Sequence, residues 1–360
     1  MRICLLRAGL SRADGLSDLV LGNPRAWLGT AYHEVLEKVP EIDRQGDVDR
    51  DLDRLWTDAI ARQYERVKSH PLDRRFGSPE TWPGYHLTEA SVRLRAHEVA
   101  SLGSTGRTER APRSARERPL VACGGKLVGR PDVVRDGEVV DYKTGEVLES
   151  DGDAEIGAVK AAYVRQLRLY GVLVREDLGW WPRRGWLLPA GGPAVEIALN
   201  PEDCEREAAE AVALLDKYNK RIENAADPRT LALASPEACR WCQYKSFCPA
   251  FWEKADSTWS GRLDGAAVEG ILLEPPRGIH GSKAFAISLD VQFGSEGCNR
   301  IDLAPLSPSV HGSIAGVSPG TRVRIIGLRL RADGSLVPGQ RTVITCVGEV
   351  PTLSVSKANT

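Results

Sequence analysis

The sequence predicts an α/β protein that carries a small all-β domain at its C-terminal end. Three observations support this prediction. Helical spacing of apolar residues dominates the first hundred positions. An apolar segment with a hairpin signal follows, at about residues 119–144. After about residue 258 the chain consists of short β-like runs broken by Gly and Pro, which is typical of a small barrel or sandwich.

Each expected element has a local signal. In the first helix, Trp27, Tyr32 and Val35 are placed at helical spacing, and Pro201 suits the first position of the last helix. Helices are expected over residues 26–38, 49–68, 87–102, 156–176 and from Pro201 to about Ile222. Strands are expected at Gly185–Pro189, Ala194–Leu199, Ala284–Leu289, Arg300–Leu303, Thr321–Leu330 and Arg341–Gly348.

Composition limits the function classes. A chain of 360 residues is expected to form two to three domains. The net charge of −1 gives no overall basic field, so any nucleic acid would bind at a local patch. No apolar run reaches the length of a membrane span, and the chain is expected to be cytoplasmic. In that reducing compartment the eight cysteines are metal ligands or buried thiols rather than disulfides.

The most informative segment is residues 130–144. Valine pairs flank the turn signal Asp136-Gly137, which predicts a β-hairpin. Asp141 and Lys143 are two residues apart, so they share one face of a strand, and Asp132 can approach them from the partner strand. Two carboxylates beside an ammonium suit a hydrated Mg²⁺ or Mn²⁺. The alternative is a surface hairpin with a simple ion pair, worth well under about 1 kcal/mol.

These residues resemble the PD-(D/E)xK nuclease superfamily. Pro131-Asp132 matches the first half of its signature and Asp141-Tyr142-Lys143 the second. The resemblance implies a restriction-endonuclease-like core, a mixed sheet flanked by helices. It also implies that Asp132, Asp141 and the carbonyl of Tyr142 bind Mg²⁺ or Mn²⁺, and that Lys143 positions and activates the attacking water. The family often has an upstream Glu, for which Glu109 and Glu117 are both candidates.

Two further motifs resemble the RecB-like branch. Gln166 and Tyr170 lie four residues apart on one helix face, as in the Gln-x3-Tyr motif that follows the catalytic hairpin and lies beside the metal site. Gly29 and His33 match a Gly-x3-His motif in which the histidine is an additional metal ligand. Taken alone, Gln166 could be an ordinary exposed residue, Tyr170 a half-buried residue and His33 a plain helix residue.

Cys239, Cys242 and Cys248 form the third motif. Three thiolates at this spacing can bind one metal centre, but a structural site normally needs a fourth ligand. The motif resembles that of RecB-like, AddB-like and CRISPR-associated exonucleases, in which one early cysteine and three late ones hold a [4Fe–4S] cluster. This resemblance implies that Cys4 is the best candidate for the fourth ligand. A zinc site and unliganded buried thiols are the alternatives. Four other cysteines are expected to be small buried hydrophobes: Cys123, Cys204, Cys298 and Cys346.

The resemblance covers roughly residues 4–252, and composition changes after about residue 258, so we expect three segments. Residues 1–256 form a nuclease domain closed by Cys4 and the cysteines at 239–248, and residues 257–269 are a linker. Residues 270–360 are a small β-domain, for which an OB-like barrel is one candidate. Within this β-domain the run from Thr321 to Arg331 alternates Arg with apolar residues. Such a basic strand face could bind single-stranded DNA, although a role in packing or protein contacts fits equally well because aromatic residues are scarce.

We therefore expect a metal-dependent DNA nuclease, an exonuclease acting on single-stranded ends in repair, recombination or defence. The alternative is a non-catalytic iron–sulfur subunit that binds DNA or acts as a scaffold in a helicase–nuclease or CRISPR adaptation complex. Gly124-Gly125-Lys126-Leu127 is not a P-loop, because Leu127 has no hydroxyl for Mg²⁺. Any helicase that works with this chain is expected to be a separate polypeptide.

Overall fold

The chain divides into two compact units in the computed structural model. We call them the hairpin unit (Asn23–Ser69 and Phe76–Lys217) and the cysteine unit (residues 4–22, 70–75 and 218–349). The structure describes residues 4–11, 15–42, 46–102, 115–116, 118–135, 137–149, 157–225 and 227–349. No helix among these residues is both long enough and apolar enough to cross a membrane.

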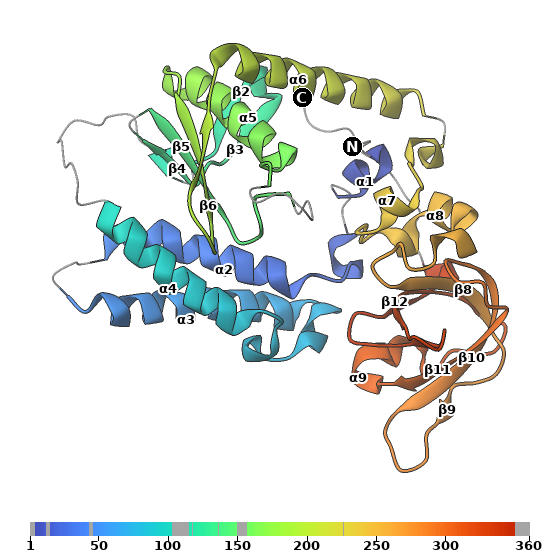
Figure 1. The fold of residues 1–360 in the computed structure, drawn as a ribbon. Helices are drawn as coiled ribbons and strands as arrows, with labels where there is room; N and C mark the ends of the chain where they lie inside the picture. The colour runs from blue at the N-terminus through green and yellow to red at the C-terminus, as the bar shows by residue number, and fades with distance from the viewer. Residues whose placement is uncertain are drawn as a thin grey trace. The chain divides into compact units, whose positions relative to one another are not determined.

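A five-stranded mixed sheet forms the centre of the hairpin unit (Figure 1). Only the contact between β5 and β6 is parallel, and the other neighbours are antiparallel. In spatial order the strands are β1 (Ala115–Arg116), β4 (Val133–Arg135), β5 (Glu138–Lys143), β6 (Arg184–Pro189) and β7 (Val195–Ala198). A separate ribbon consists of β2 (Leu120–Ala122) and β3 (Leu127–Gly129).

The predicted hairpin is confirmed as β4 and β5. Val133 pairs with Val140, and Arg135 pairs with Glu138, which leaves a two-residue connection. Gly137 in that connection has φ 84°, a conformation that glycine adopts without strain. The four residues Val139–Tyr142 are all buried, so β5 is covered on both faces. Asp141 is therefore a carboxylate in the middle of a buried strand.

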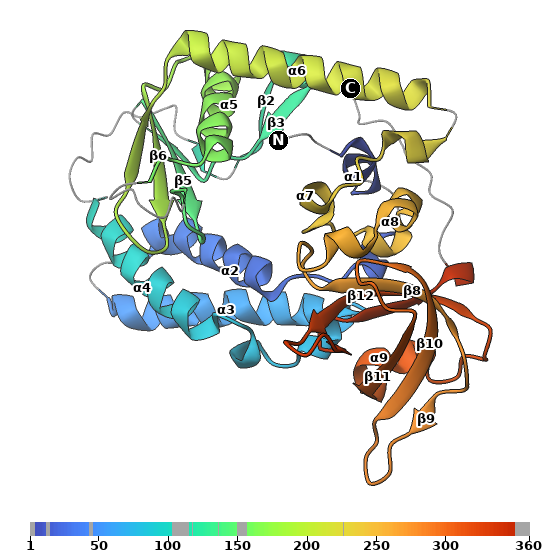
Figure 2. The same ribbon diagram turned by 45° about the vertical axis from the view of Figure 1, so that its right-hand side comes forward.

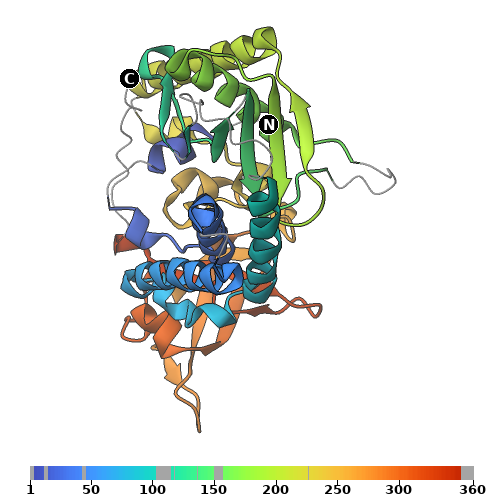
Figure 3. The ribbon, with the colours of Figure 1, turned by 90° about the vertical axis from the view of Figure 1, so that its left-hand side faces the viewer.

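Helices flank this sheet. The spans are α2 (Pro24–Lys38), α3 (Val48–Ser69), α4 (Tyr85–Leu102), α5 (Ala161–Leu178) and α6 (Pro201–Glu223). The Asn23 side chain accepts a hydrogen bond from the Arg25 amide and caps α2, with Pro24 in its first turn. Leu167 and Leu173 of α5 pack on the sheet in one core with Val134 and Leu187. Figures 1 and 3 show α2, α3 and α4 side by side as a helical layer at one end of the strands.

One helix begins later than the sequence suggests. The expected helix at 156–176 begins at Ala161, because Val159 pairs with Leu148 in an isolated β-bridge and is held in an extended conformation. The helix ends at Leu178, and the next residue, Gly179, has a φ of 84° and forms a left-handed cap. The start of the expected range, residue 156, lies outside the described residues.

The cysteine unit combines short helices with an antiparallel sheet (Figure 2). The helices are α1 (Leu5–Leu10), α7 (Pro236–Cys239), α8 (Pro249–Lys254) and α9 (Pro308–His311). The main path of the sheet is β11 (Arg300–Leu306), β10 (Phe285–Gly294), β8 (Ala266–Leu272), β12 (Arg322–Leu330) and β13 (Leu336–Val337). β14 (Val343–Cys346) also pairs with β12, and β9 (Arg277–Gly278) with β10.

The β-sheet expected after residue 258 is confirmed, with the short helix α9 in addition, but a central strand was missed. β8 begins at Ala266, inside the segment 257–269 that the sequence suggests as a linker, and lies between β10 and β12. Its residues from Ala266 to Gly270 are all buried. The three suggested segments 1–256, 257–269 and 270–360 stay predictions, as does the OB-like form of the last.

Candidate functional site

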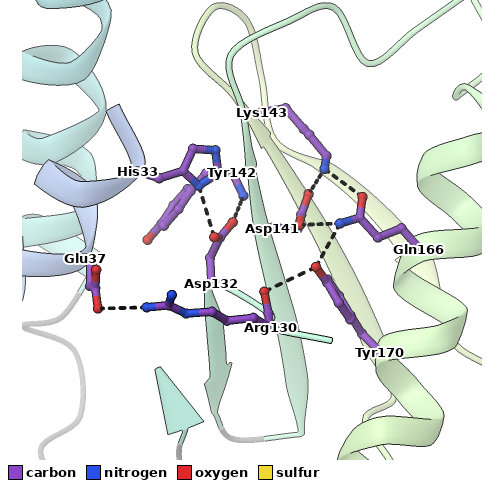
Figure 4. A network of polar contacts seen from close by, with 9 residues as sticks. All are labelled: His33, Glu37, Arg130, Asp132, Asp141, Tyr142, Lys143, Gln166 and Tyr170. Carbon is purple, nitrogen blue, oxygen red and sulfur yellow. Dashed lines mark hydrogen bonds and ion pairs between the residues drawn. The ribbon is translucent and has the colours of Figure 1, made fainter. Parts of the chain in front are cut away.

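Asp132 lies just before β4, opposite Asp141 on β5, and its carboxylate connects two elements. Oδ1 lies 3.0 Å from Nδ1 of His33 on α2, and Oδ2 accepts a hydrogen bond of 2.6 Å from the Tyr142 backbone amide (Figure 4). The carboxylate side chain is only 11% exposed. Asp132 thus fixes the imidazole of His33 beside the hairpin.

Asp141, Lys143 and Gln166 form the other half of the site. Lys143 Nζ contacts Oδ2 of Asp141 and donates a hydrogen bond of 2.8 Å to Oε1 of Gln166. The amide nitrogen of Gln166 donates to Asp141 Oδ1 at 3.2 Å and to the Tyr170 hydroxyl at 2.8 Å. The Tyr170 hydroxyl in turn donates to the backbone carbonyl of Arg130 at 3.3 Å. Residues from β5 and α5 therefore hold one ammonium in a defined position.

Burial controls the electrostatics of the network. It raises the pKa of Asp141 to about 6, with the nearby Asp132 adding to the rise and the Lys143 ammonium opposing it. The pKa of Tyr170 is also raised, mainly by burial and then by the charge of Asp141, so the phenol stays protonated. Two carboxylates close together in a poorly hydrated site favour the approach of a further positive charge.

The donor set fits a hard divalent cation. Asp132 and Asp141 offer carboxylate oxygens, the ligands that Mg²⁺ and Mn²⁺ prefer, and His33 adds an imidazole beside them. The carboxylates here contact His33, Lys143 and backbone instead, and the described part of the chain contains no three His, Cys, Asp or Glu side chains already arranged to hold a metal ion. The Tyr142 carbonyl remains a predicted ligand.

A cleft opens on the His33 side of this network. Its lining consists of Arg25, Ala26, Gly29, Thr30, His33, Arg130, Asp132 and Thr144. Sequence analysis missed Arg25, Arg130 and Thr144. Arg130 comes directly before Pro131-Asp132, and Thr144 comes directly after Lys143. Their position next to the signature could therefore have indicated that they line the site. Arg25 has no such signal, because only the packing of α2 against the hairpin brings it to the cleft. Glu37 lies 3.9 Å from the Arg130 guanidinium (Figure 4).

Gly29 allows α2 to approach the exit of β5 closely. A Cβ atom at this position would lie 3.3 Å from Oγ1 of Thr144, which is tighter than ordinary van der Waals contact. His33 is one helical turn later on the same face of α2. The glycine of the Gly-x3-His motif therefore has a steric reason here: it lets the helix bring His33 to the hairpin.

Replacing this glycine tests the argument. We expect Gly29→Val to push α2 away from Thr144, loosen the contact between His33 and Asp132, and raise the Mn²⁺ concentration for half-maximal activity about tenfold. The matched variant Gly29→Val with Thr144→Ala removes the crowding atoms and is expected to recover most of the loss. A metal titration of activity measures both, and equal defects in the two variants would contradict the steric explanation.

The cysteine unit places four predicted ligands around one hollow. Cys4, Cys239, Cys242 and Cys248 all line it, together with apolar side chains that include Leu6 and Phe251. Cys4 lies at the start of α1, and its sulfur accepts a hydrogen bond of 3.4 Å from the Leu233 amide. The first residues of the described chain thus meet the segment that carries the other three cysteines.

Cys239 is buried, the other three cysteines are partly buried, and two cations lie near Cys242. Burial raises the pKa of Cys239 to about 11 and that of Cys248 to about 12, and neighbouring cysteines add to both shifts. Arg7 and the buried Lys245 act in the opposite direction on Cys242. The raised pKa values of Cys239, Cys242 and Cys248 favour the neutral thiol at these three positions. A bound metal would stabilise the thiolates, and Arg7 and Lys245 would offset the negative charge of a four-thiolate centre.

The remaining cysteines serve packing to different degrees. Cys204 and Cys346 are buried, as expected, and Cys204 packs against Gly171 of α5. Cys123 and Cys298 are only partly buried, so the expectation of small buried hydrophobes is wrong for them. Cys123 lies in a short turn where its amide donates to Glu176. Glu109 and Glu117, the candidates for an upstream acid, lie outside the described residues.

Comparison with known proteins gives one family. The family model described as the PD-(D/E)XK nuclease superfamily matches residues 1–249. This range contains both halves of the hairpin network and all four cysteines around the hollow. No curated protein matches the chain.

Proposed function

Since the chain belongs to the PD-(D/E)XK nuclease superfamily, we propose that it is a metal-dependent DNA exonuclease of the RecB-like type that acts on single-stranded ends. The observation that carries this proposal is the network of Asp132, Asp141 and Lys143 on one hairpin, completed by Gln166 from α5. Membership of the superfamily implies phosphodiester hydrolysis, and a complete set of acidic and basic groups is what this reaction requires.

Each residue receives a role from its contacts. Asp132 and Asp141, with His33 and the Tyr142 carbonyl, would hold Mg²⁺ or Mn²⁺. The metal would lower the pKa of the attacking water and polarise the phosphoryl oxygen. Lys143, held by Asp141 and Gln166, would position that water and stabilise the negative charge that develops on phosphate. Gln166 and Tyr170 would keep the ammonium and the hairpin aligned.

The cleft beside His33 would receive the DNA backbone. Arg25 and Arg130 line it together with Asp132 and His33. Arg130 is already near Glu37, whereas Arg25 lies exposed in the first turn of α2. A guanidinium next to the metal-binding side chains suits a phosphate adjacent to the one that is cleaved.

Arg25→Ala tests this placement. We expect the variant to bind DNA of every sequence more weakly. The slope of the logarithm of the binding constant against the logarithm of the salt concentration should fall by about one, because one phosphate contact is lost. The turnover rate at saturating DNA and the metal requirement should be unchanged. Arg54, an exposed arginine of α3 whose partner is Asp51, provides the matched control Arg54→Ala. Equal effects of Arg25→Ala and Arg54→Ala would show that DNA binding depends only on the overall charge of the protein.

We also propose that Cys4, Cys239, Cys242 and Cys248 hold a [4Fe–4S] cluster, with zinc as the less favoured occupant. Their common hollow, the burial of the thiols and the two nearby cations support a four-thiolate centre. Such a centre would fix the beginning of the chain to the segment at 239–248. A cytoplasmic location, where thiols stay reduced, agrees with eight free cysteines.

A cleavage assay decides between a nuclease and a non-catalytic subunit. End-labelled single-stranded and duplex DNA are incubated with the full chain and Mn²⁺, and the products are sized over time. Progressive shortening of single strands supports the proposal. Tight binding without cleavage would instead support a DNA-binding or scaffolding subunit that works with a separate helicase or with CRISPR adaptation proteins.

A further inference from the structure

The basic face of β12 is directed at a buried carboxylate. The Glu269 side chain on β8 is 1% exposed, and it pairs with Arg322 and Arg324 on the neighbouring strand. Arg324 Nε donates to Glu269 Oε2 at 2.6 Å, and Arg322 Nη2 contacts the other carboxylate oxygen. The alternating arginines that suggest a DNA-binding face are thus partly neutralised within the sheet.

Arg324 also reaches the cysteine segment, and Arg322 has no such contact among the described residues. A second nitrogen of Arg324, Nη1, donates a hydrogen bond of 3.1 Å to the backbone carbonyl of Ser246. Its guanidinium lies over the Trp252 ring, 5.3 Å from the centroid. Ser246 is buried and lies between Cys242 and Cys248. The same guanidinium therefore contacts the carboxylate of the sheet and the backbone of the loop.

Apolar packing joins the same two parts. Cys239, Phe251 and Trp252 share one core cluster with Ala267 of β8, and Cys248 and Ile326 of β12 pack against it. Figures 1 and 2 show α7 and α8 directly beside β8 and β12. Two of the four cysteines thus touch a core that the C-terminal sheet completes.

We propose that Arg324, oriented by Glu269, is a positioning residue for the four-cysteine site, and that the C-terminal sheet is a structural part of that site. The loop between Cys242 and Cys248 is held at Ser246 by a charge-assisted hydrogen bond whose donor is fixed by a buried carboxylate. Since the loop spacing sets where the thiolates lie, the sheet determines the shape of the metal site. The effect of Arg324 on metal binding rests on the proposed cluster, whereas its effect on the loop between Cys242 and Cys248 does not.

The chain contains a matched pair of variants for the test. Arg324→Met removes the guanidinium and the hydrogen bond to Ser246 but keeps the apolar stem. Arg322→Met also removes one cation from Glu269 but leaves the loop contact. Both variants retain one arginine on the buried carboxylate, and only Arg324→Met releases the loop.

Two measurements on the full chain separate the outcomes. Iron and zinc per chain, and their rate of release to a chelator, report the metal site. The reaction rate of the metal-free thiols with a thiol reagent reports the loop itself. For Arg324→Met we expect release about tenfold faster and thiol reaction several-fold faster, with Arg322→Met close to wild type. Unchanged values for Arg324→Met, or equal changes in both variants, would overturn the inference. If the wild-type chain contained no metal, the proposed cluster would be refuted but the role of Arg324 would not. The reaction rates of the thiols in the two variants would still decide that role.

Discussion

Asp141→Asn is expected to reduce DNA cleavage by at least about a hundredfold, and Lys143→Met by a similar factor. Under the proposed mechanism, Asp141→Asn removes the anionic oxygen that would hold the metal, and Lys143→Met removes the ammonium that would stabilise charge in the transition state. Such a loss is typically about 10²–10³ in rate. Neither change removes a large packed group. Single-turnover cleavage at saturating Mn²⁺ and DNA measures the effect.

The direction in which Asp141→Asn changes the stability of the fold can be predicted. Burial raises the pKa of folded Asp141 to about 6 from its ordinary 3.8, so ionising it disfavours the folded state increasingly as pH rises between these values. Asp141→Asn removes this cost at neutral pH and leaves Lys143 near Gln166. We therefore expect thermal unfolding of the metal-free variant at or above the wild-type temperature, which separates lost chemistry from lost fold.

A control is available on the same strand. Glu138 at the start of β5 pairs with Arg184 at 2.6 Å and takes no part in the network. Glu138→Gln should cleave like wild type. Digestion at a normal rate by purified, folded Asp141→Asn or Lys143→Met would remove these residues from the catalytic site, whatever the control shows.

Cys242→Ser is expected to have the second large effect. Anaerobically purified wild-type protein should be brown and carry about four irons per chain, the composition of a [4Fe–4S] centre held by four thiolates. Cys242→Ser should lose this iron and become sensitive to protease, because binding of a structural metal contributes on the order of 10 kcal/mol to folding. Metal analysis, absorbance and limited proteolysis check the result.

Cys4→Ser and Cys204→Ser extend this test. Cys4 would close a loop of more than two hundred residues, so loss of its link should release iron and expose the chain much as Cys242→Ser does. Cys204 is equally a cysteine but is buried against α5 in the hairpin unit, and its replacement should keep the iron. Full iron content in Cys4→Ser would mean that another group supplies the fourth ligand. Colourless wild-type protein with one zinc per chain would show that the site holds zinc and not an iron–sulfur cluster.

Local signals in the sequence determined much of the candidate site. Paired valines on both sides of Asp136-Gly137 predict the hairpin, because β-branched residues and a two-residue turn favour it without help from the rest of the chain. The period of two along a strand then places Asp141 and Lys143 together, as the structure shows. Gln166 and Tyr170 share a helix face for the equivalent reason, and their hydroxyl–amide contact follows.

Elements without a strong local pattern depended on their neighbours. β8 reads Ala-Ala-Val-Glu-Gly-Ile-Leu, a run with three small residues and a charge. It becomes the central strand because β10 and β12 pair with it on both sides. The start of α5 is set by the bridge between Leu148 and Val159. Neither pairing can be deduced from the residues of the element itself.

The sequence by itself predicted which residues carry chemistry: the Asp132, Asp141 and Lys143 set and the cysteines. Tertiary structure alone decided what surrounds them. Arg25 reaches the cleft only because α2 packs on the hairpin, and Arg324 turns from a candidate DNA contact into a partner of Glu269 because β12 pairs with β8. The physical reason is that strand and helix periods fix directions within an element, whereas contacts between distant elements depend on packing that no short pattern encodes.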